Sequence, residues 1–351
     1  MVINIGKCKR ARLVGKQQFA VETIDFPEVN GSPIVKVKHV GICGSDLHYW
    51  DLGDSDGKDL VLGHEYTGIV VDPGNSDFEI GDKVVGYTQN PKNDYCGTCP
   101  ACLAGDYDNC RKRAVYVSIG CHPVHPGAYS EYVTWYKNAF FKIPEGVSME
   151  QATLTEPFAV GLHAVELGGV KAGMSVLILG GGIIACAIAE WCRLHGASII
   201  HMTEISESKR LQIKEFGIVD RVYKADDPKL ADNLRASVPD GYDIVFDALA
   251  LSEPLNMGLK LLRRDGTCVM VGVNFNKILV DVYETVVFQK KIQGSKGHTP
   301  ECFHAVLKAI ECGAIDTEKY ITSRTSIDNV QSAFERTKRE NSDFKVLIDF
   351  E

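Results

Sequence analysis

The sequence predicts an α/β protein with two parts, a β-rich region and a parallel sheet covered by helices. Residues 1 to about 155 contain short Val/Ile runs broken by glycine and proline, which is typical of a compact barrel-like or sandwich region. Beyond Pro157, nearly continuous apolar runs alternate with helical patterns, which indicates a parallel sheet buried on both faces. The length of 351 residues is that of about two domains.

Composition and charge exclude several classes of protein. The chain has 38 Lys+Arg against 46 Asp+Glu, a net charge of −8, which argues against a nucleic-acid partner. Hydrophobic residues make up 45% of the chain, so intrinsic disorder is excluded. No run of about 18 apolar residues is present, so no membrane span is expected. Residues 1–7 lack the apolar core of a signal peptide, and we expect a cytoplasmic protein with reduced thiols.

The expected elements follow in chain order. Residues 35–40 alternate apolar and polar side chains, as in a half-buried strand. Past Pro157 the expected strands are 174–179, 197–202, 242–246 and 267–273, and the expected helices are 183–195, 206–216 and 254–262. The last region contains an amphipathic stretch at 300–312 and a closing strand at 345–350.

A glycine-rich turn joins the first of the later strands to a helix. Residues 180–185, GGGIIA, fit the pattern G-x-G-x-x-G/A. Gly180 makes the tight turn, Gly182 lets the backbone approach a pyrophosphate, and Ala185 permits close packing of helix on sheet. The N–H groups and dipole of the helix N-terminus favour phosphate there. The alternative is a plain glycine turn followed by a solvated acidic residue.

That acidic residue stands at the end of the second expected strand. Glu204 lies 22 residues beyond Gly182, where it can accept hydrogen bonds from the adenosine ribose hydroxyls. Its negative charge would repel a 2′-phosphate, so NAD is favoured over NADP. Lys209, close by in sequence, could contact the ribose or weaken that preference.

Four cysteines are crowded into one segment, Cys96-x2-Cys99-x2-Cys102-x7-Cys110. Such a run converges several sulfurs on one point, which suits a tetrahedral metal better than pairwise disulfides. Four thiolates leave no position for a substrate, so the expected ion is a structural zinc. An iron–sulfur centre and unrelated packed thiols are the alternatives.

A second set of ligand-type side chains is dispersed along the chain. Cys43 lies in a turn-to-helix segment, and His64 and Glu65 lie between two glycines. Glu156 stands where the β-rich texture ends. A thiol, an imidazole and a carboxylate with an open fourth position make a catalytic zinc site. Taken singly, Cys43 could equally be a core residue and His64 a loop histidine.

Together these motifs resemble the zinc-dependent medium-chain dehydrogenase/reductase family over essentially the whole chain. The segment GICGSD around Cys43, GHE at 63–65, the four-cysteine lobe, EP at 156–157 and the glycine turn occur in the family's order and spacing. Glu65 and residues 156–160 resemble the polyol and sugar-acid branch, which includes sorbitol, threonine 3- and L-galactonate 5-dehydrogenases.

The resemblance implies a GroES-like catalytic domain with an inserted Rossmann coenzyme domain. The implied domains are 1–155, with a structural-zinc lobe at about 93–112, then the NAD-binding domain at 156–295 and a return to the catalytic domain at 296–351. The implied ligands of catalytic zinc are Cys43, His64 and Glu65, with Glu156 as a further or alternating ligand. The implied ligands of structural zinc are Cys96, Cys99, Cys102 and Cys110.

Coenzyme contacts also follow from the resemblance. The implied contact residues are Gly180, Gly182, Ile183, Ile184, Glu204, Lys209, Val271, Gly272 and Val273, with Gly294 and Ser295 at the nicotinamide end. The chain departs from the family pattern at two positions. Ala185 stands where the family usually has Gly, and Glu204 stands where Asp is commoner.

The expected reaction is the reversible oxidation of a secondary hydroxyl of a polyol, sugar or sugar acid to a ketone with NAD. Zinc lowers the pKa of the hydroxyl, and hydride passes to the nicotinamide. The proton then leaves through Ser45, the ribose and His48. The alternatives are a turn or helix-cap role for Ser45 and a surface position for His48.

Five side chains are expected near the substrate. Tyr49 and Trp50 could wall the site, although core packing is equally expected. His122 and His125 lie in a Gly/Pro-rich loop and could bind hydroxyls or a carboxylate, with solvated loop histidines as the alternative. Lys296 could pair with an anionic substrate group, or be a surface lysine.

Other functions remain open from the sequence. A threonine 3-dehydrogenase or a simple secondary-alcohol dehydrogenase is the alternative within enzymes. A non-catalytic nucleotide-binding relative is disfavoured, because a binding module needs neither the zinc ligands nor Ser45. A homo-dimer or homo-tetramer is expected, with a strand at 285–288 available to pair across a two-fold. The remaining cysteines are expected to be small packed hydrophobes: Cys8, Cys121, Cys186, Cys192, Cys268, Cys302 and Cys312.

Overall fold

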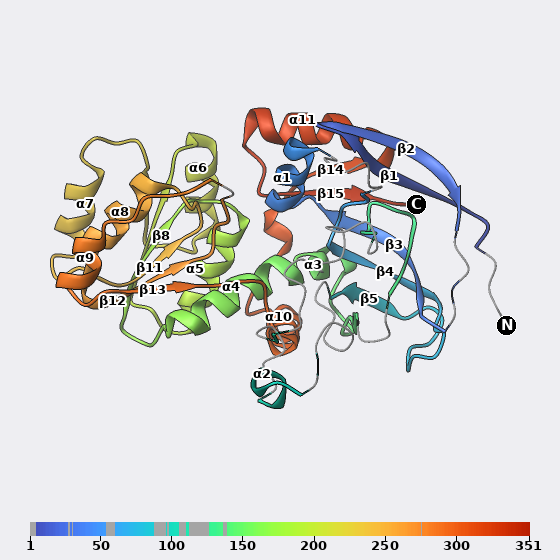
Figure 1. Ribbon diagram of the computed structural model, residues 1–351, viewed down its shortest axis with the longest axis horizontal. Helices are drawn as coiled ribbons and strands as arrows, with labels where there is room; N and C mark the ends of the chain where they lie inside the picture. The colour runs from blue at the N-terminus through green and yellow to red at the C-terminus, as the bar shows by residue number, and fades with distance from the viewer. Residues whose placement is uncertain are drawn as a thin grey trace. The chain divides into compact units, whose positions relative to one another are not determined.

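The chain forms two compact units (Figure 1). The first unit combines Met1–Glu156 with Leu307–Glu351, and the second is Pro157–Val306. Both ends of the chain therefore build the first unit, and the second is inserted between them. The structure is a computed structural model that describes residues 5–26, 29, 31–53, 60–87, 96, 98–104, 110–111, 126–135, 139–274 and 276–351.

A mixed sheet of seven strands, counted over the described residues, is the centre of the first unit. Strand β15, from the C-terminal end of the chain, lies between β14 and β3, so residues far apart in sequence share one sheet. Within this sheet, β14 and β15 are parallel, and the other strand pairs are antiparallel. The strands in spatial order are β14 (Ile321–Ser326), β15 (Lys345–Asp349), β3 (Ile34–Gly41), β4 (Glu65–Asp72), β5 (Lys83–Gly86) and β7 (Phe140–Lys142), with β6 (Tyr132–Thr134) paired to β3.

A two-stranded ribbon and short helices complete the first unit, which confirms the expected β-rich region. Its core includes Trp50, Tyr66, Tyr129 and Phe334, all buried. The aromatic rings of Tyr129 and Phe334 meet edge to face, 6.0 Å apart. The elements are β1 (Lys7–Gly15), β2 (Gln18–Asp25), α1 (Gly44–Leu52), α2 (Pro100–Leu103), α3 (Met149–Thr153) and α11 (Val330–Glu340), with 3-10 turns at Glu318–Tyr320 and Ile327–Asn329.

Six parallel strands form the sheet of the second unit. Every residue of β8 is buried, because helices lie on both sides of the sheet (Figure 1). The parallel sheet expected from the apolar runs is thereby confirmed, and it is the Rossmann-type sheet that the family resemblance implies. The strands in spatial order are β10 (Arg221–Lys224), β9 (Ile199–Glu204), β8 (Ser175–Leu179), β11 (Tyr242–Asp247), β12 (Leu262–Met270) and β13 (Lys291–Gly294).

Two helices carry the chain between the units, α4 (Thr155–Gly168) and α10 (Pro300–Glu311). The return to the first unit falls inside α10, at Leu307, which is later than the expected position 296. A single continuous helix spans this crossing, so no linker marks it in the sequence. The other helices of the second unit are α5 (Ile183–Leu194), α6 (Glu207–Phe216), α7 (Leu230–Ser237), α8 (Ser252–Leu261) and α9 (Val282–Val287).

Helix α9 corrects one prediction, because residues 285–288 were expected to form a strand. Asp281 is the N-cap of α9 and accepts from the Glu284 N–H at 3.4 Å. The Asp281 N–H donates to Asn256 Oδ1 at 2.6 Å, which fixes the cap to α8. Lys290 Nζ donates to Glu284 Oε2 at 2.8 Å. These tertiary contacts override the β preference of a segment rich in β-branched residues.

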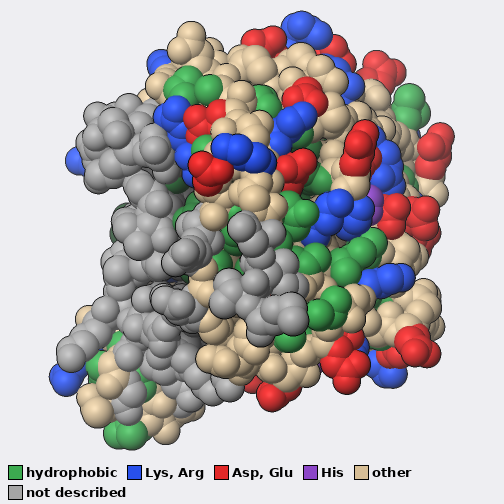
Figure 2. All heavy atoms as spheres, turned by 90° about the vertical axis from the view of Figure 1, so that its right-hand side faces the viewer, with side chains coloured by type: hydrophobic (Ala, Val, Ile, Leu, Met, Phe, Trp, Pro, Cys, Tyr) green, Lys and Arg blue, Asp and Glu red, His purple; other side chains and the backbone are tan. Residues whose placement is uncertain are grey.

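The surface of the described residues carries charges of both signs. On the face drawn in Figure 2, Lys and Arg side chains are interspersed with Asp and Glu side chains. Within the described part of the chain, none of the helices combines the length and apolarity needed to cross a bilayer.

Candidate active site and coenzyme site

The first ligand-type residue stands between β3 and α1. Cys43 is the N-cap of α1, with an extended backbone at φ −99° and ψ 155°. Its backbone N–H donates to Asp46 Oδ2 at 3.0 Å, which closes the first turn of the helix. The half-buried Cys43 thiol is therefore fixed just beyond the end of β3.

His64 and Glu65 meet this thiol through the pairing of β3 with β4. Glu65 is the first residue of β4 and lies opposite Gly41, at the end of β3. One ligand atom each of Cys43, His64 and Glu65 lies within 4.8 Å of the others. Glu65 Oε1 is buried and has no hydrogen-bond partner among the described residues, as expected of an oxygen reserved for a cation. This donor set of sulfur, imidazole and carboxylate fits zinc.

A buried aspartate next to His64 was not predicted from the sequence. Asp46 accepts from the Tyr129 hydroxyl at 2.9 Å, and its Oδ1 lies 3.4 Å from His64 Nδ1. Burial lowers the pKa of His64, but Asp46 and then Cys43 outweigh it and raise that pKa well above its usual value. Asp46 thus holds the Nδ1 side of the ring and leaves Nε2 toward the other ligand groups.

Glu65 has a buried cation beside it, which the sequence analysis also missed. Lys345 Nζ lies 2.5 Å from Glu65 Oε2 and donates to the Ile42 carbonyl at 3.1 Å. Burial raises the pKa of Glu65, and Lys345 acts against that rise. A Cβ at Gly41 would overlap Glu65 Oε2 and lie 3.0 Å from Lys345 Cδ. Glycine at position 41 therefore makes room for this ion pair.

Glu156 lies close to the same carboxylate. It is the second residue of α4 and is buried, with 8% of its surface exposed. Three influences on the pKa of Glu65 are largest: burial raises it, Lys345 lowers it, and the charge of Glu156 raises it. The structure thus places a second carboxylate near Cys43, His64 and Glu65.

The two residues of the expected proton path lie on α1. Ser45 Oγ is 3.4 Å from His64 Nε2, so the hydroxyl lies beside one of the three proposed zinc ligands. His48 lies one turn farther along α1 and is exposed. In the expected proton path, the Ser45 hydroxyl is therefore the group next to His64, and the His48 imidazole is the group next to solvent.

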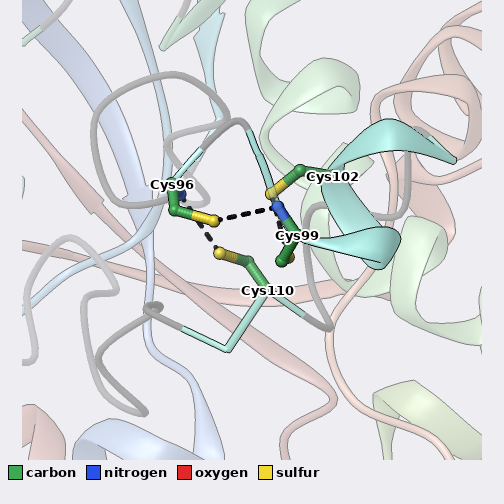
Figure 3. Close-up of side chains that lie close together, drawn as sticks. All are labelled: Cys96, Cys99, Cys102 and Cys110. Atoms are coloured by element: carbon green, nitrogen blue, oxygen red, sulfur yellow. Dashed lines mark hydrogen bonds between the residues drawn. The ribbon is translucent and has the colours of Figure 1, made fainter.

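The four-cysteine lobe converges as expected (Figure 3). The sulfurs of Cys96, Cys99, Cys102 and Cys110 lie within 4.8 Å of one another, and none of them forms a disulfide. The backbone N–H of Cys99 donates to Cys96 Sγ at 3.2 Å, and that of Cys96 donates to Cys110 Sγ at 3.2 Å. Hydrogen bonds from the hydroxyl and N–H of Thr98 lower the pKa of Cys96 to about 5. A low thiol pKa favours the thiolate that a metal needs.

The glycine turn in the second unit joins β8 to α5. Gly180 has φ +100°, a left-handed conformation suited to glycine, directly after β8. Gly182 is the N-cap of α5, and a Cβ there would meet no described atom within 4 Å. Packing therefore does not explain this glycine, and the open space would let a phosphate approach the backbone. Ala185 is fully buried, as expected for close packing of helix and sheet.

Glu204 ends β9, beside this turn. Its Oε1 accepts from the Ser206 N–H at 2.7 Å, and it is 7% exposed. A Cβ at Gly181 would lie 2.7 Å from Glu204 Oε2, so the turn and the carboxylate are in contact. Lys209 is buried on α6, and Arg210 Nη1 donates to the Glu204 carbonyl at 3.0 Å.

The remaining expected coenzyme residues share one edge of the sheet. Ile183 and Ile184 begin α5. Val271, Gly272 and Val273 follow β12, and Gly294 and Ser295 end and follow β13. All stand at the carboxyl ends of parallel strands or just beyond, where ligands bind in open α/β sheets.

A buried aspartate, Asp247, organises this edge and was not predicted. It ends β11, and its Oδ1 accepts from the N–H groups of Leu249 and Ala250 at 3.0 and 3.1 Å. Its carbonyl accepts from Val271 and Gly272, each at 2.9 Å. Asp247 therefore holds together the loops that follow β11 and β12.

The expected substrate residues receive different placements. Trp50 is buried, with its ring 5.7 Å from that of Phe334, and Tyr49 packs against the same core. This placement agrees with the core-packing alternative for Trp50, because the surface of Trp50 is used in packing. Lys296 is exposed after β13, whereas His122 and His125 lie outside the described residues.

The remaining cysteines need one correction. Cys312 is exposed at the end of α10, whereas it was expected to be packed. Cys121 lies outside the described residues. The buried ones are Cys8, Cys186, Cys192, Cys268 and Cys302.

Comparisons with known proteins match both units. Residues 30–145 match the family model described as alcohol dehydrogenase GroES-like domain, and residues 182–311 match the one described as zinc-binding dehydrogenase. The first model covers most strands of the sheet in the first unit, and the second begins at the glycine turn of the second unit.

Full-length relatives agree with these matches. The chain is 29% identical over 345 residues to the Aspergillus clavatus protein named probable D-xylulose reductase A, covering 93% of this chain and 92% of that protein. It is 28% identical over 352 residues to sorbitol dehydrogenase of Bacillus subtilis strain 168, covering 97% and 96%. A solved zinc-binding dehydrogenase of Sinorhizobium meliloti 1021 with NADP bound superposes with TM-score 0.84 at 28% identity, covering 98% and 100%. The chain therefore belongs to the zinc-dependent medium-chain dehydrogenase/reductase family and is a dehydrogenase of that family.

Proposed function

We propose that this enzyme oxidises a secondary hydroxyl of a polyol, sugar or sugar acid to a ketone, with NAD as the hydride acceptor. The convergence of Cys43, His64 and Glu65, with the Ser45 hydroxyl at His64, is the observation that carries the proposal. The names of two relatives, a D-xylulose reductase and a sorbitol dehydrogenase, support the substrate class.

In this proposal Cys43, His64 and Glu65 hold the catalytic ion, and Glu156 is a further ligand. Zinc held there would supply Lewis-acid chemistry at the substrate hydroxyl, and a nicotinamide in the coenzyme site would accept the hydride. Asp46 orients the imidazole of His64 through its Nδ1 side. The second zinc of the proposal is structural and belongs to the four-cysteine lobe.

Ser45 and His48 move the proton in this proposal. A serine hydroxyl accepts and donates at once, so Ser45 can take the proton from the substrate hydroxyl. His48 is exposed and can pass the proton to solvent, because a histidine side chain can act as a general acid and base. Substrate oxidation therefore needs both a half-buried hydroxyl and an exposed base on α1.

NAD rather than NADP is the proposed coenzyme because of Glu204. Its carboxylate lies at the end of β9 against the glycine turn, where it can accept from ribose hydroxyls. The similar structure from Sinorhizobium meliloti contains NADP, so both NAD+ and NADP+ must be compared in the test of this preference.

The decisive experiment is an absorbance screen for NADH or NADPH formation with polyols, aldonates, inositols, threonine and short secondary alcohols. We expect polyols or sugar acids with NAD+ to give the highest kcat/KM, and metal analysis to give two zinc ions per chain. Cys43→Ser should lose one zinc and more than about 100-fold in kcat, because even groups behind the ligands contribute 10–100-fold. Cys8→Ser, a buried thiol outside both clusters, is the matched control. Zinc-loaded protein that oxidises no hydroxyl compound would favour a nucleotide-binding protein without catalysis.

A further inference from the structure

A third group of metal-ligating side chains lies in the second unit, apart from both zinc clusters. His163 and Glu166 are on α4, and Cys302 is on α10. One ligand atom of each lies within 4.8 Å of the others. Neither the proposed reaction nor the coenzyme site uses these three residues.

Local structure explains why the three side chains converge. His163 and Glu166 are three residues apart, so they share one face of α4. Cys302 stands in the first turn of α10, where its N–H donates to Thr299 Oγ1 at 3.3 Å. The Thr299 hydroxyl in turn donates to Cys302 Sγ at 3.4 Å. Thr299 therefore fixes the sulfur in position.

The sulfur is directed at the carboxylate on α4. Cys302 Sγ donates to Glu166 Oε2 at 3.7 Å, and Cys302 is 1% exposed. Burial raises the pKa of the Cys302 thiol, so the proton stays on sulfur while no cation is bound. Glu166 is exposed and His163 is half-buried, so an ion can enter from the Glu166 side.

We propose that His163, Glu166 and Cys302 form a third metal site, which takes a divalent transition-metal ion of the zinc type. Imidazole and thiolate ligands favour zinc-type ions over magnesium and calcium, which prefer oxygen ligands alone. Binding replaces the proton of the Cys302 thiol by the metal, and that proton is released to solvent. Three protein ligands leave a fourth position open, so this ion exchanges more readily than one held by four cysteines.

Occupation of this site has a consequence for the fold. Helices α4 and α10 are the segments through which the chain passes between the two units. Glu156, near the zinc ligands, is on the same helix α4, two turns before His163. An ion held by His163, Glu166 and Cys302 links these two connecting helices to each other.

Cobalt titration tests the third site directly. Co²⁺ is added to the full-length, zinc-loaded enzyme, and the sulfur-to-cobalt charge-transfer absorbance is recorded together with the metal content. We expect one Co²⁺ per chain beyond the resident zinc, with the charge-transfer band lost in Cys302→Ala. His163→Ala and Glu166→Gln should each weaken Co²⁺ binding by at least about tenfold.

Cys312→Ser is the matched control, because it removes an exposed thiol directly after the same helix. This variant should keep both the extra Co²⁺ and the charge-transfer band. Cys302→Ser tests folding, since a serine hydroxyl can keep the hydrogen bond to Glu166, and its Tm and dehydrogenase activity should match those of the wild type. A wild-type enzyme that binds no additional Co²⁺, or a band that persists in Cys302→Ala, would overturn the proposal and leave a simple thiol–carboxylate hydrogen bond.

Discussion

Lys345 shows how much of the active site depends on a residue 280 positions away from its partner. The side chains of Lys345 and Glu65 are 1% and 0% exposed, so each ion depends on the other for compensation. In such a pair the cost of removing both ions from water competes with their attraction. Removal of one partner alone leaves an uncompensated buried charge, which is the more damaging change.

We therefore expect Lys345→Met to lower the free energy of unfolding by about 3–5 kcal/mol. Urea denaturation with the wild type in parallel measures the difference. Lys308→Met is the control, since Lys308 is exposed and pairs with Glu311 on the surface, where solvent screens the pair and the free energy of unfolding should stay close to that of the wild type. Equal losses in the two variants would show that Glu65 does not need its partner.

Glu204 determines coenzyme preference in our proposal, and the charge can be removed without changing the shape. Glu204→Gln keeps an oxygen for the Ser206 N–H but no longer repels a 2′-phosphate. We expect the ratio of kcat/KM for NAD+ to that for NADP+ to fall by roughly tenfold or more, because an ionic hydrogen bond exceeds a neutral one by about 1–2 kcal/mol.

Steady-state kinetics with both coenzymes and one hydroxyl substrate give this ratio. Glu207→Gln, an exposed carboxylate in the first turn of α6, should leave it unchanged. A ratio in Glu204→Gln equal to that of the wild type would remove Glu204 from coenzyme discrimination.

Sequence patterns located the residues whose chemistry is carried by local motifs. Cys43, His64 and the four clustered cysteines stand in short segments whose spacing is informative by itself. Asp46 stands inside the GICGSD segment, but its role depends on Tyr129 and His64, which approach only after folding. Lys345 carries no local signal, because it reaches Glu65 through the placement of β15 beside β3. The roles of Asp46 and Lys345 could therefore not be predicted from sequence patterns, because they depend on contacts between distant segments of the chain.

At the scale of elements, the strands β8 and β11 are joined by side chains as well as by their backbones. Asp243 Oδ2 accepts from the Ser175 N–H at 2.8 Å, and Asp243 Oδ1 accepts from Arg263 Nε at 2.6 Å. Burial raises the pKa of Asp243, but Ser175 and Arg263 outweigh it and lower that pKa below its usual value. A carboxylate with a lowered pKa in the folded state stabilises the fold above the unfolded pKa of about 4.

Asp243→Asn should therefore lower the free energy of unfolding by about 1–2 kcal/mol at neutral pH, because neutral hydrogen bonds replace ionic ones. This difference should disappear as the pH falls below 4 through the lowered pKa, since the wild-type carboxylate is then protonated. Urea denaturation at several pH values between 7 and 3 measures it. Asp232→Asn, an exposed change on α7, should show little effect at any pH. A difference that stays constant in acid would mean that the charge of Asp243 is unimportant.

Long periodic elements were predictable, whereas short ones depended on their neighbours. Helices α5 and α10 and strands β8 and β11 fall close to the expected ranges, because their apolar patterns run over several turns or pleats. Helix α9 contains only Val282–Val287 and has a strand-like composition. Its helical state depends on Asp281 and on the contact of Asp281 with Asn256, which no local pattern shows.

At the scale of the whole molecule, the second unit has an exposed apolar surface at the edge of its sheet. Strand β13 is the last strand in the sheet order, and all four of its residues are exposed. On the neighbouring α9, Tyr283 and Val286 are 67% and 68% exposed. An open strand edge beside apolar side chains favours association with another chain. We therefore predict that copies of the chain, if they associate, meet through α9 and β13 rather than through a strand at 285–288.

Val286→Glu tests this contact, because a carboxylate buried between two copies of the chain would be unpaired and costly. We expect sedimentation velocity to show a multimer for the wild type and a monomer for the variant at the same micromolar concentration. Leu211→Glu is the control, since Leu211 is 54% exposed on α6, away from β13 in the sheet order, and should keep the wild-type mass. Because an isologous contact repeats each residue about a two-fold, one substitution alters the interface twice. A multimer that survives Val286→Glu unchanged would show that copies of the chain associate through another face.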